Sequence, residues 1–367
     1  MSKNLRFKWL ACWTVSALLL GACVATEEEP GQTGVDETLA AAQAQDPAAG
    51  DVTVQISTDK TIVRARESVA LQVTLTNNST RAVRLLAWYA PDTELEEDLF
   101  VLTREGKPVE FIGPHYKRPA PVHSDYLTLP PGKSVTRTVE LSGFYDLSMT
   151  GNYQIRYSAE LKEAGGSVSI KSKDVTLWIE GRASDTPQAV PDTASLTSSL
   201  AFSKCTADQQ GTVTQAAGAA STMANDANAY LSGAAAANPR YTTWFGQFST
   251  SGWNTAKSHF VAIKDAFDTK PLTLDCGCRK KYYAYVYPNQ PYNIYLCSVF
   301  WNAPLSGTDS KGGTLIHEMS HFNVVASTND WVYGQTSAKS LAISDPTKAL
   351  NNADNHEYFA ENTPLLQ

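Results

Sequence analysis

Basic residues, long apolar segments and cysteines are all scarce in this 367-residue chain, and each scarcity excludes a class of protein. Lys and Arg number 30 against 37 Asp and Glu, and the formal net charge of −7 gives no basic footprint for binding nucleic acid. No apolar run after residue 23 is long enough to span a membrane. Hydrophobic residues still make up 43% of the chain, so we expect folded domains, and nothing demands more than a monomer.

The N-terminus has the pattern of an export signal. Three basic residues precede the short apolar run WLACWTVSALLLGAC. Its end, LGAC, resembles a bacterial lipobox, in which the cysteine becomes the lipidated first residue; a plain secretory signal is the alternative. We therefore expect residues 1–22 to be a removed signal and Cys23 to carry lipid. The chain would be exported from a bacterial cell, with a membrane reached only through this anchor.

Composition then divides the chain into four further parts. Residues 23–50 are polar and acidic, which is typical of a flexible tether. Residues 51–180 show short runs of period-two alternation separated by turns, which predicts an all-β antiparallel sandwich of immunoglobulin-like type. A polar excursion at 113–126 interrupts these runs and is either functional or simply exposed. Residues 181–200 are the second linker, and 201–367 form an α+β domain.

Within the last part we expect helices over Thr206–Leu231, Trp253–Phe267 and Thr314–Val325, because apolar residues recur there at helical spacing. The stretch KKYYAYVYPNQPYNIYLC predicts two strands joined as a hairpin. Four cysteines lie in this part, an even number that in an exported chain predicts two disulfides with three connectivities open. They are Cys205, Cys276, Cys278 and Cys297.

The predicted helix at 314–325 contains the pattern H-E-x-x-H. His317 and His321 lie one turn apart on one helix face, so both imidazoles can reach a single zinc ion. Glu318 lies beside the first histidine and is free to act as a general base in hydrolysis. Two partly exposed histidines on an ordinary amphipathic helix are the alternative.

A catalytic zinc needs a third protein ligand and an open position. No histidine follows at the spacing that metzincins require, and Glu357 is much further along than the thermolysin-like glutamate. Asp330 follows a turn of Ser, Thr and Asn and can return a carboxylate to the ion. Tyr333 would lie on the same side if that segment is helical, with its phenol available to an oxyanion.

These residues carry a resemblance to a known family. HEMSH followed by TNDWVYG is similar to the aspzincins, the deuterolysin group of zinc metallopeptidases, whose third ligand is an aspartate. The resemblance implies a zincin-type fold and one catalytic Zn2+ ion. It also implies the roles of five residues: His317, His321 and Asp330 as ligands, Glu318 as general base, and Tyr333 as the residue that stabilises the transition state.

The resemblance extends over almost all of 201–367 and is greatest to the peptidyl-Lys metalloendopeptidases. The shared stretches are NPRYTTWFG, AYVYPN, WNAPLSGTDSKGGTL and NADNHEYFAENTP. It implies the disulfides Cys205–Cys276 and Cys278–Cys297. One departure is Ser327, which stands where the family commonly has glycine.

In this subgroup an aspartate and a glutamate of the last stretch line the pocket for the residue after the scissile bond. They fall on Asp354 and Glu357, which face the same way on a helix and together suit a lysine ammonium. We expect replacement of both to relax lysine preference while sparing the metal. A solvated acidic helix face is the alternative for this pair.

The sandwich at 51–180 precedes a complete enzyme domain, as the pro-regions of exported deuterolysin-type peptidases do. We expect it to block the cleft, with a permanent spacer or adhesive domain as the alternative. A cysteine switch is excluded because the sandwich contains no cysteine. The linker from Gly181 to Ser203 contains no lysine, so a lysine-directed enzyme could not cut itself there. We therefore predict activation by another protease, or at Lys204.

The sequence thus predicts an exported zinc endopeptidase, made as a zymogen, that cleaves protein or peptide substrates on the amino side of lysine. Two alternatives remain open. One is an aspzincin of broader specificity, and the other is an inactive, surface-anchored β-sandwich binding lipoprotein.

Overall fold

The computed structural model describes residues 44–90, 94–163, 166–182 and 199–367. The expected signal, the lipidated Cys23, most of the tether and most of the second linker therefore lie outside the described residues. Residues Ala40–Gln367 belong to one compact unit. Among the described residues, no helix is both long enough and apolar enough to cross a membrane.

The N-terminal part consists of strands in two main sheets around a common apolar core. One sheet has the order β1-β3-β9, with the bounds Val52–Ser57, Ala70–Asn77 and Ser134–Glu140. The other has the order β2-β12-β10-β5-β6, with the bounds Ile62–Val63, Val175–Ile179, Gly151–Glu163, Phe100–Arg104 and Lys107–Pro108. Strand β11 (Gly166–Lys171) pairs with β10, and β4 (Val83–Leu86) pairs with β8 (Tyr126–Leu129). Short 3-10 helices occupy Ala87–Tyr89 and His123–Asp125.

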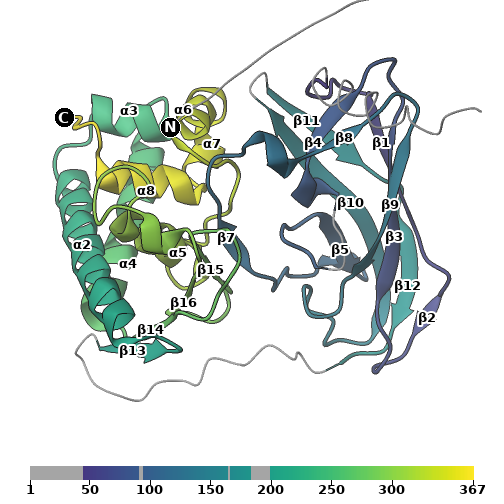
Figure 1. The fold of residues 1–367 in the computed structure, drawn as a ribbon, viewed down its shortest axis with the longest axis horizontal. Helices are drawn as coiled ribbons and strands as arrows, with labels where there is room; N and C mark the ends of the chain where they lie inside the picture. Colours follow the sequence, from purple (N-terminus) through teal and green to yellow (C-terminus); the bar gives the residue numbers. More distant parts are fainter. Residues whose placement is uncertain (1–43, 91–93, 164–165, 183–198) are drawn as a thin grey trace, which may run out of the picture. The chain divides into compact units, whose positions relative to one another are not determined.

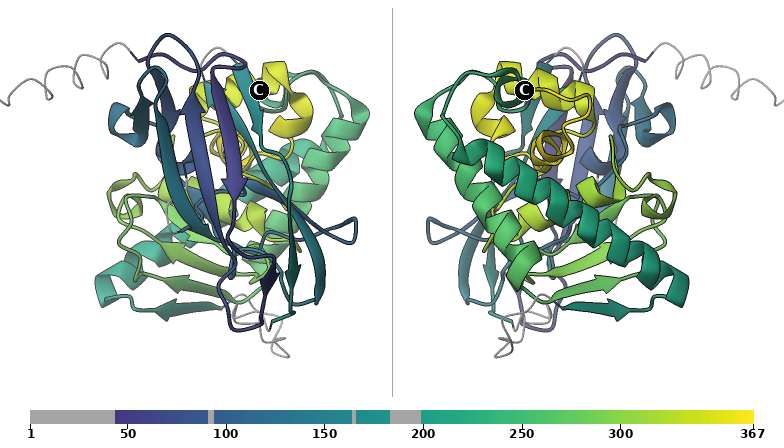
Figure 2. Two further views of the ribbon diagram at one scale, coloured as in Figure 1. Left: turned by 90° about the vertical axis from the view of Figure 1, so that its right-hand side faces the viewer. Right: turned by 90° about the vertical axis from the view of Figure 1, so that its left-hand side faces the viewer.

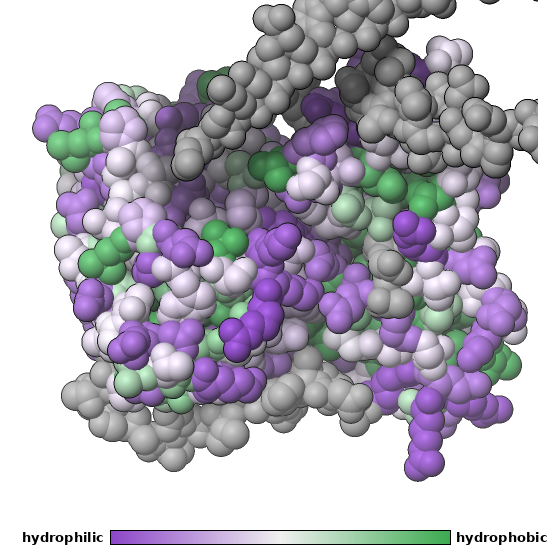
Figure 3. Space-filling model, viewed as in Figure 1, coloured by the Kyte–Doolittle hydropathy of each residue, from purple (hydrophilic) through white to green (hydrophobic). Residues whose placement is uncertain are grey.

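The alternation of apolar and polar residues in the sequence explains which face of each strand is buried. In β3, Leu71, Val73 and Leu75 point into the core while the intervening residues are more exposed, as expected for a strand covered on one side. On the face shown in Figure 3, hydrophobic residues form separate patches among hydrophilic ones. Most of the buried apolar side chains of the N-terminal part form one core cluster.

The C-terminal part contains a five-stranded sheet of order β13-β14-β16-β15-β7. Strands β13 (Leu200–Ser203), β14 (Leu272–Asp275) and β16 (Asn293–Leu296) are parallel, whereas β15 (Ala284–Val286) runs antiparallel to β16 and forms the expected hairpin with it. Beyond β15 lies β7 (His115–Lys117), which comes from the polar excursion of the N-terminal part. This short strand, between the two parts in Figure 1, is the first structural sign of what the excursion does.

Helices cover this sheet. The long helices α2 (Ala207–Ser232) and α4 (Thr250–Thr269) match the two expected ones and pack side by side (Figure 2). Helix α2 begins at a capping box of Thr206 and Gln209 and buries a stripe of alanines, which allows close packing. The remaining helices are α3 (Pro239–Phe245), α5 (Lys311–His321), α6 (Gln335–Ser344), α7 (Pro346–Ala349) and α8 (Ala353–Glu361), with a 3-10 turn at Phe300–Asn302.

Helix α5 is shorter than the sequence predicts, because it ends at His321 and not at Val325. Phe322 leaves the helical conformation, and the chain turns back so that the Thr328 N–H donates to the Ser320 carbonyl. Val324, which the helical pattern would bury, is exposed. At the other end, Gly313 is required by packing, since a Cβ there would lie 2.1 Å from Glu361 Oε1.

Both disulfides connect the pairs that the family resemblance implies. Cys205–Cys276 joins the start of α2 to the end of β14 over 71 residues. Cys278–Cys297 closes a loop of sequence separation 19 that contains the whole β15–β16 hairpin. Each crosslink stabilises the fold mainly by restricting the unfolded chain.

Candidate metal centre and cleft

Two histidines of α5 and an aspartate from the following loop meet at one buried point. His317 Nε2 lies 3.1 Å and His321 Nε2 lies 3.4 Å from Asp330 Oδ1. Ligands at zinc–ligand distances of about 2.0–2.1 Å in a tetrahedron are about 3.3 Å apart, so this spacing fits. These donor atoms are buried and lack a hydrogen-bond partner in the described residues. Buried nitrogen and oxygen atoms that lack a hydrogen-bond partner and have this spacing fit the coordination of a zinc ion.

Neighbouring groups fix the orientation of both imidazoles. The His321 ring is held by the Thr328 carbonyl, 2.8 Å from Nδ1. His317 Nδ1 lies 2.8 Å from Asp354 Oδ1 and 3.4 Å from Glu357 Oε2. Such partners orient a ligand and set its tautomer, and their loss commonly weakens metal binding about 10–100-fold. This contact leads us to expect that replacing Asp354 affects metal binding as well as lysine preference, because the carboxylate also contacts a proposed ligand.

Glu318 lies on α5 directly after the first histidine and is fully buried. Neither of its carboxylate oxygens has a hydrogen-bond partner among the described residues. Burial raises the pKa of Glu318 to about 7. A carboxylate with a pKa near neutrality is suited to accept and return a proton in catalysis.

Tyr333 is buried near the cluster, but it does not share a helix with Asp330. The segment between α5 and α6 is irregular, so its phenol is placed by loop geometry and not by helical spacing. The phenol oxygen accepts a hydrogen bond from Arg118 Nη1 at 2.7 Å and donates one to Glu97 Oε1 at 3.2 Å. Both partners belong to the N-terminal part. Its residues therefore engage the group expected to stabilise an oxyanion.

Asp354 and Glu357 lie one turn apart on α8, are fully buried and face a lysine of the same chain. Lys117 Nζ is 2.5 Å from Glu357 Oε2 and 3.5 Å from Asp354 Oδ1. A third carboxylate oxygen, Asp309 Oδ1, also lies 3.5 Å from this ammonium. The ring of Tyr283 lies 4.9 Å from it, at a cation–π distance. Burial opposes the charged ammonium, but the three carboxylates raise the pKa of Lys117 well above its usual range.

Strand β7 delivers this lysine. It pairs antiparallel with the edge strand β15, with Lys117 opposite Ala284 and His115 opposite Val286, and the Tyr283 N–H donates to the Lys117 carbonyl at 2.9 Å. Addition of an extended segment to an exposed sheet edge is a common mode of peptide recognition. The segment 113–120 is called the β7 segment below.

The sequence did not predict His115, Lys117 or Arg118 as residues of the cleft. The available signal was the polar excursion at 113–126, which interrupts the strand pattern and contains a histidine and a lysine two residues apart. Only the long-range pairing of β7 with β15 brings them to α5 and α8.

Ser327 adopts φ +49°, the left-handed conformation that glycine occupies without strain. This explains why a glycine is favoured at the position in the family that the sequence resembles. The turn is held by Asn351 Nδ2, which donates to the Ser327 carbonyl at 2.9 Å. The substitution thus changes backbone strain and leaves Asp330 in place.

A family model of the aspzincins (M35), described as lysine-specific metallo-endopeptidase, matches residues 230–361. An extracellular protease of Aeromonas hydrophila is 47% identical over 312 residues, which covers 81% of this chain and 89% of that protein. A peptidyl-Lys metalloendopeptidase of Grifola frondosa is 35% identical over 310 residues, covering 79% and 87%. The solved structure of a zinc peptidase from Grifola frondosa matches with 46% identity and a TM-score of 0.43, covering 44% of this chain and 100% of that one.

Proposed function

Because the chain belongs to the aspzincin (M35) family of zinc metalloendopeptidases, we propose that it is the exported precursor of an enzyme that cuts proteins on the amino side of lysine. The observation that carries the lysine preference is Lys117, whose ammonium lies between Glu357 and Asp354. The names of the two relatives, an extracellular protease and a peptidyl-Lys metalloendopeptidase, agree with this proposal.

The pocket favours a long side chain that ends in a compact positive charge. Its acidic groups are Glu357 and Asp354, both fully buried, and Asp309 beside them. Buried carboxylates without a cation are costly, since an unpaired buried charge loses its hydration. The apolar stem of a lysine would lie against the ring of Tyr283. The best occupant of the empty pocket is therefore a substrate lysine in the place of Lys117.

The mechanism assigns one role to each group of the cleft. Zinc held by His317, His321 and Asp330 would act as a Lewis acid toward the scissile carbonyl and lower the pKa of water. Glu318 accepts the proton of the attacking water and passes it to the leaving amine. Once its present partners leave, the Tyr333 phenol donates to the oxyanion. Strand β15 holds the substrate extended by backbone pairing.

We further propose that residues 51–180 form an immunoglobulin-like sandwich that acts as an inhibitory pro-domain. Three contacts support inhibition over a permanent spacer role: β7 covers the free edge of β15, Lys117 fills the pocket, and Arg118 engages Tyr333. Activation would require another protease in the linker 181–200, or cleavage at Lys204. Cys23 would anchor the precursor to a membrane by lipid until that cut releases the enzyme.

A digest tests the function. The activated enzyme is incubated with an unfolded protein that contains many lysines and arginines, and the new termini are mapped by mass spectrometry. We expect new N-termini that begin with lysine and none that begin with arginine. Glu318→Gln should bind zinc and produce no cleavage. New termini spread over other residues would favour the broader-specificity alternative, and a digest without cleavage by zinc-loaded enzyme would favour the binding lipoprotein.

A further inference from the structure

We infer that His115 is a zinc ligand in the precursor, where it occupies the coordination position that the active enzyme must leave open. This inference rests on the proposed function, because it concerns how the same metal site is kept inactive. It goes beyond steric covering of the cleft, since it assigns a direct bond to the metal. It also names a residue of the N-terminal part that would have to leave before catalysis.

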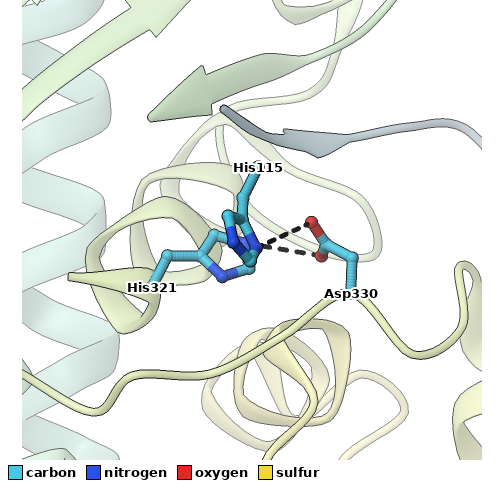
Figure 4. Close-up of side chains that lie close together, drawn as sticks. All are labelled: His115, His321 and Asp330. Atoms are coloured by element: carbon cyan, nitrogen blue, oxygen red, sulfur yellow. Dashed lines mark ion pairs between the residues drawn. The ribbon is translucent and has the colours of Figure 1, made fainter. Parts of the chain in front are cut away.

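The first support is the position of the ring. A ring nitrogen of His115, a ring nitrogen of His321 and a carboxylate oxygen of Asp330 all lie within 4.8 Å of one another. Its Nδ1 is 3.9 Å from Asp330 Oδ2, and its ring centroid is 4.8 Å from that of His321 (Figure 4). In Figure 4 the two imidazoles, one from β7 and one from α5, converge on the Asp330 carboxylate. Ligand atoms on a tetrahedral zinc ion are about 3.3 Å apart, so the His115 ring would have to move closer to Asp330 in order to bind the metal.

The second support is the strand register, which fixes where His115 points. Residues two apart on a strand project to the same face, so His115 and Lys117 both enter the cleft while Tyr116 faces away. Tyr116 packs against Tyr282 and Tyr285, with ring centroids 5.1 and 5.3 Å away. Since Lys117 is held by buried carboxylates and Tyr116 by these rings, His115 is positioned beside the metal site at little further entropic cost.

The third support is the number of protein ligands available to the zinc ion. His317, His321 and Asp330 supply three ligands, and a catalytic zinc keeps its fourth position for water or substrate. Addition of His115 completes four protein ligands, which is the closed arrangement of structural zinc sites. The sandwich contains no cysteine to perform this role. A neutral imidazole is the other common fourth ligand for zinc, and β7 supplies one at the right place.

The consequence is a precursor that binds zinc and cannot catalyse. Water and the substrate carbonyl are both excluded from the metal while His115 is bound. Withdrawal of the β7 segment would open the metal position, the lysine pocket and the Tyr333 phenol together. Zinc should also be held more tightly by the precursor than by the mature enzyme.

The test counts imidazoles on the metal. Full-length precursor carrying Glu318→Gln, which cannot process itself, is loaded with zinc and measured by X-ray absorption spectroscopy. We expect outer-shell scattering from three imidazoles. Adding His115→Ala should reduce this to two, with an oxygen in place of the third, and should speed zinc loss to a chelator by about tenfold or more. The matched control His123→Ala, at an exposed histidine of the same part, should leave three.

Two further measurements keep the result interpretable. If His115→Ala does not fold, His115→Gln preserves most of the side-chain volume, and the mature Glu318→Gln enzyme gives a two-imidazole reference without any change at this position. Cobalt-substituted protein should show a different visible absorption band in precursor and mature forms.

The inference is overturned if the parent precursor shows two imidazoles, or if removal of His115 changes neither the count nor the rate of zinc loss. The proposed function fails in a different way, through the digest. An enzyme that cuts before lysine while its precursor has only two imidazoles would retain the function and remove this inference. A precursor with three imidazoles on the metal, whose mature enzyme shows no preference for lysine, would retain this inference and remove the proposed lysine specificity.

Discussion

Replacing Lys117 by methionine should release the β7 segment from the cleft. Methionine keeps much of the apolar stem and removes the ammonium that faces Glu357 and Asp354. Removing one partner of a buried ion pair costs about 3–5 kcal/mol. Asp354 keeps contacts with His317 and the Gly334 N–H, so the lower end of that range, about 3 kcal/mol, applies here. This corresponds to roughly a 150-fold increase in the population of the released segment.

The Tyr283 amide is the reporter of this release. Its N–H donates to the Lys117 carbonyl, so it is protected from hydrogen exchange only while β7 pairs with β15. In zinc-loaded Glu318→Gln precursor, Lys117→Met should speed exchange of this amide by roughly 150-fold, the factor expected from about 3 kcal/mol. In catalytically intact precursor, the same change should produce measurable hydrolysis of a short lysine-containing peptide.

Lys133→Met is the matched control, because Lys133 is an exposed lysine at the β8–β9 turn and its ammonium makes no ion pair among the described residues. It should change neither the exchange nor the hydrolysis. Unchanged exchange of the Tyr283 amide in Lys117→Met would refute the reasoning, since it would mean that the pocket carboxylates do not hold the segment in place.

Three further predictions follow from the cleft. In metal-free protein, burial raises the pKa of Glu318 from 4.5 to about 7, so the folded state binds the extra proton and the free energy of unfolding should fall as pH rises from 4.5 to 7. Relative to Glu318→Gln the fall should be about 3 kcal/mol, measured by urea unfolding, and parallel pH profiles of the two proteins would contradict it. Asp354→Asn should weaken zinc binding about 10–100-fold, because the Asp354 carboxylate lies 2.8 Å from the His317 ring. Glu357→Gln should mainly reduce the preference for lysine, because Glu357 lies 3.4 Å from that ring. Equal zinc affinities of the two variants would argue against this division of roles. At φ +49°, Ser327→Val should be about 2 kcal/mol less stable than Ser327→Gly, and equal melting temperatures would count against strain at this turn.

Local patterns predicted much of the fold correctly. The helices α2 and α4 and the β15–β16 hairpin follow from residue periodicity, which depends on neighbours a few positions apart. The end of α5 was predicted wrongly, since Val324 and Val325 continue the apolar pattern but the chain turns after His321. That turn is stabilised by contacts with Thr328, a residue beyond the predicted helix.

The cleft residues also divide into those whose roles follow from local spacing and those whose roles depend on contacts between distant segments. His317, Glu318 and His321 belong to one helical turn, so their spacing alone indicates a metal-assisted hydrolysis. The double role of Asp354, which contacts both His317 and Lys117, is visible only once α5, α8 and β7 are packed together. No spacing rule connects a strand of the N-terminal part to a helix more than two hundred residues later.

The sequence by itself predicted the chemistry that we propose for this protein: a helix that binds a metal, a base beside the first histidine, and two acids one turn apart on another helix. Those groups lie close in the chain, and helix geometry places them. Only the tertiary structure shows that residues of the N-terminal part occupy the cleft of this chain. His115 and Lys117 meet the metal site and the pocket because an extended segment pairs with the free edge of β15. Backbone pairing of this kind has no sequence signature of its own, so the chain's own occupant of the cleft could be found only in three dimensions.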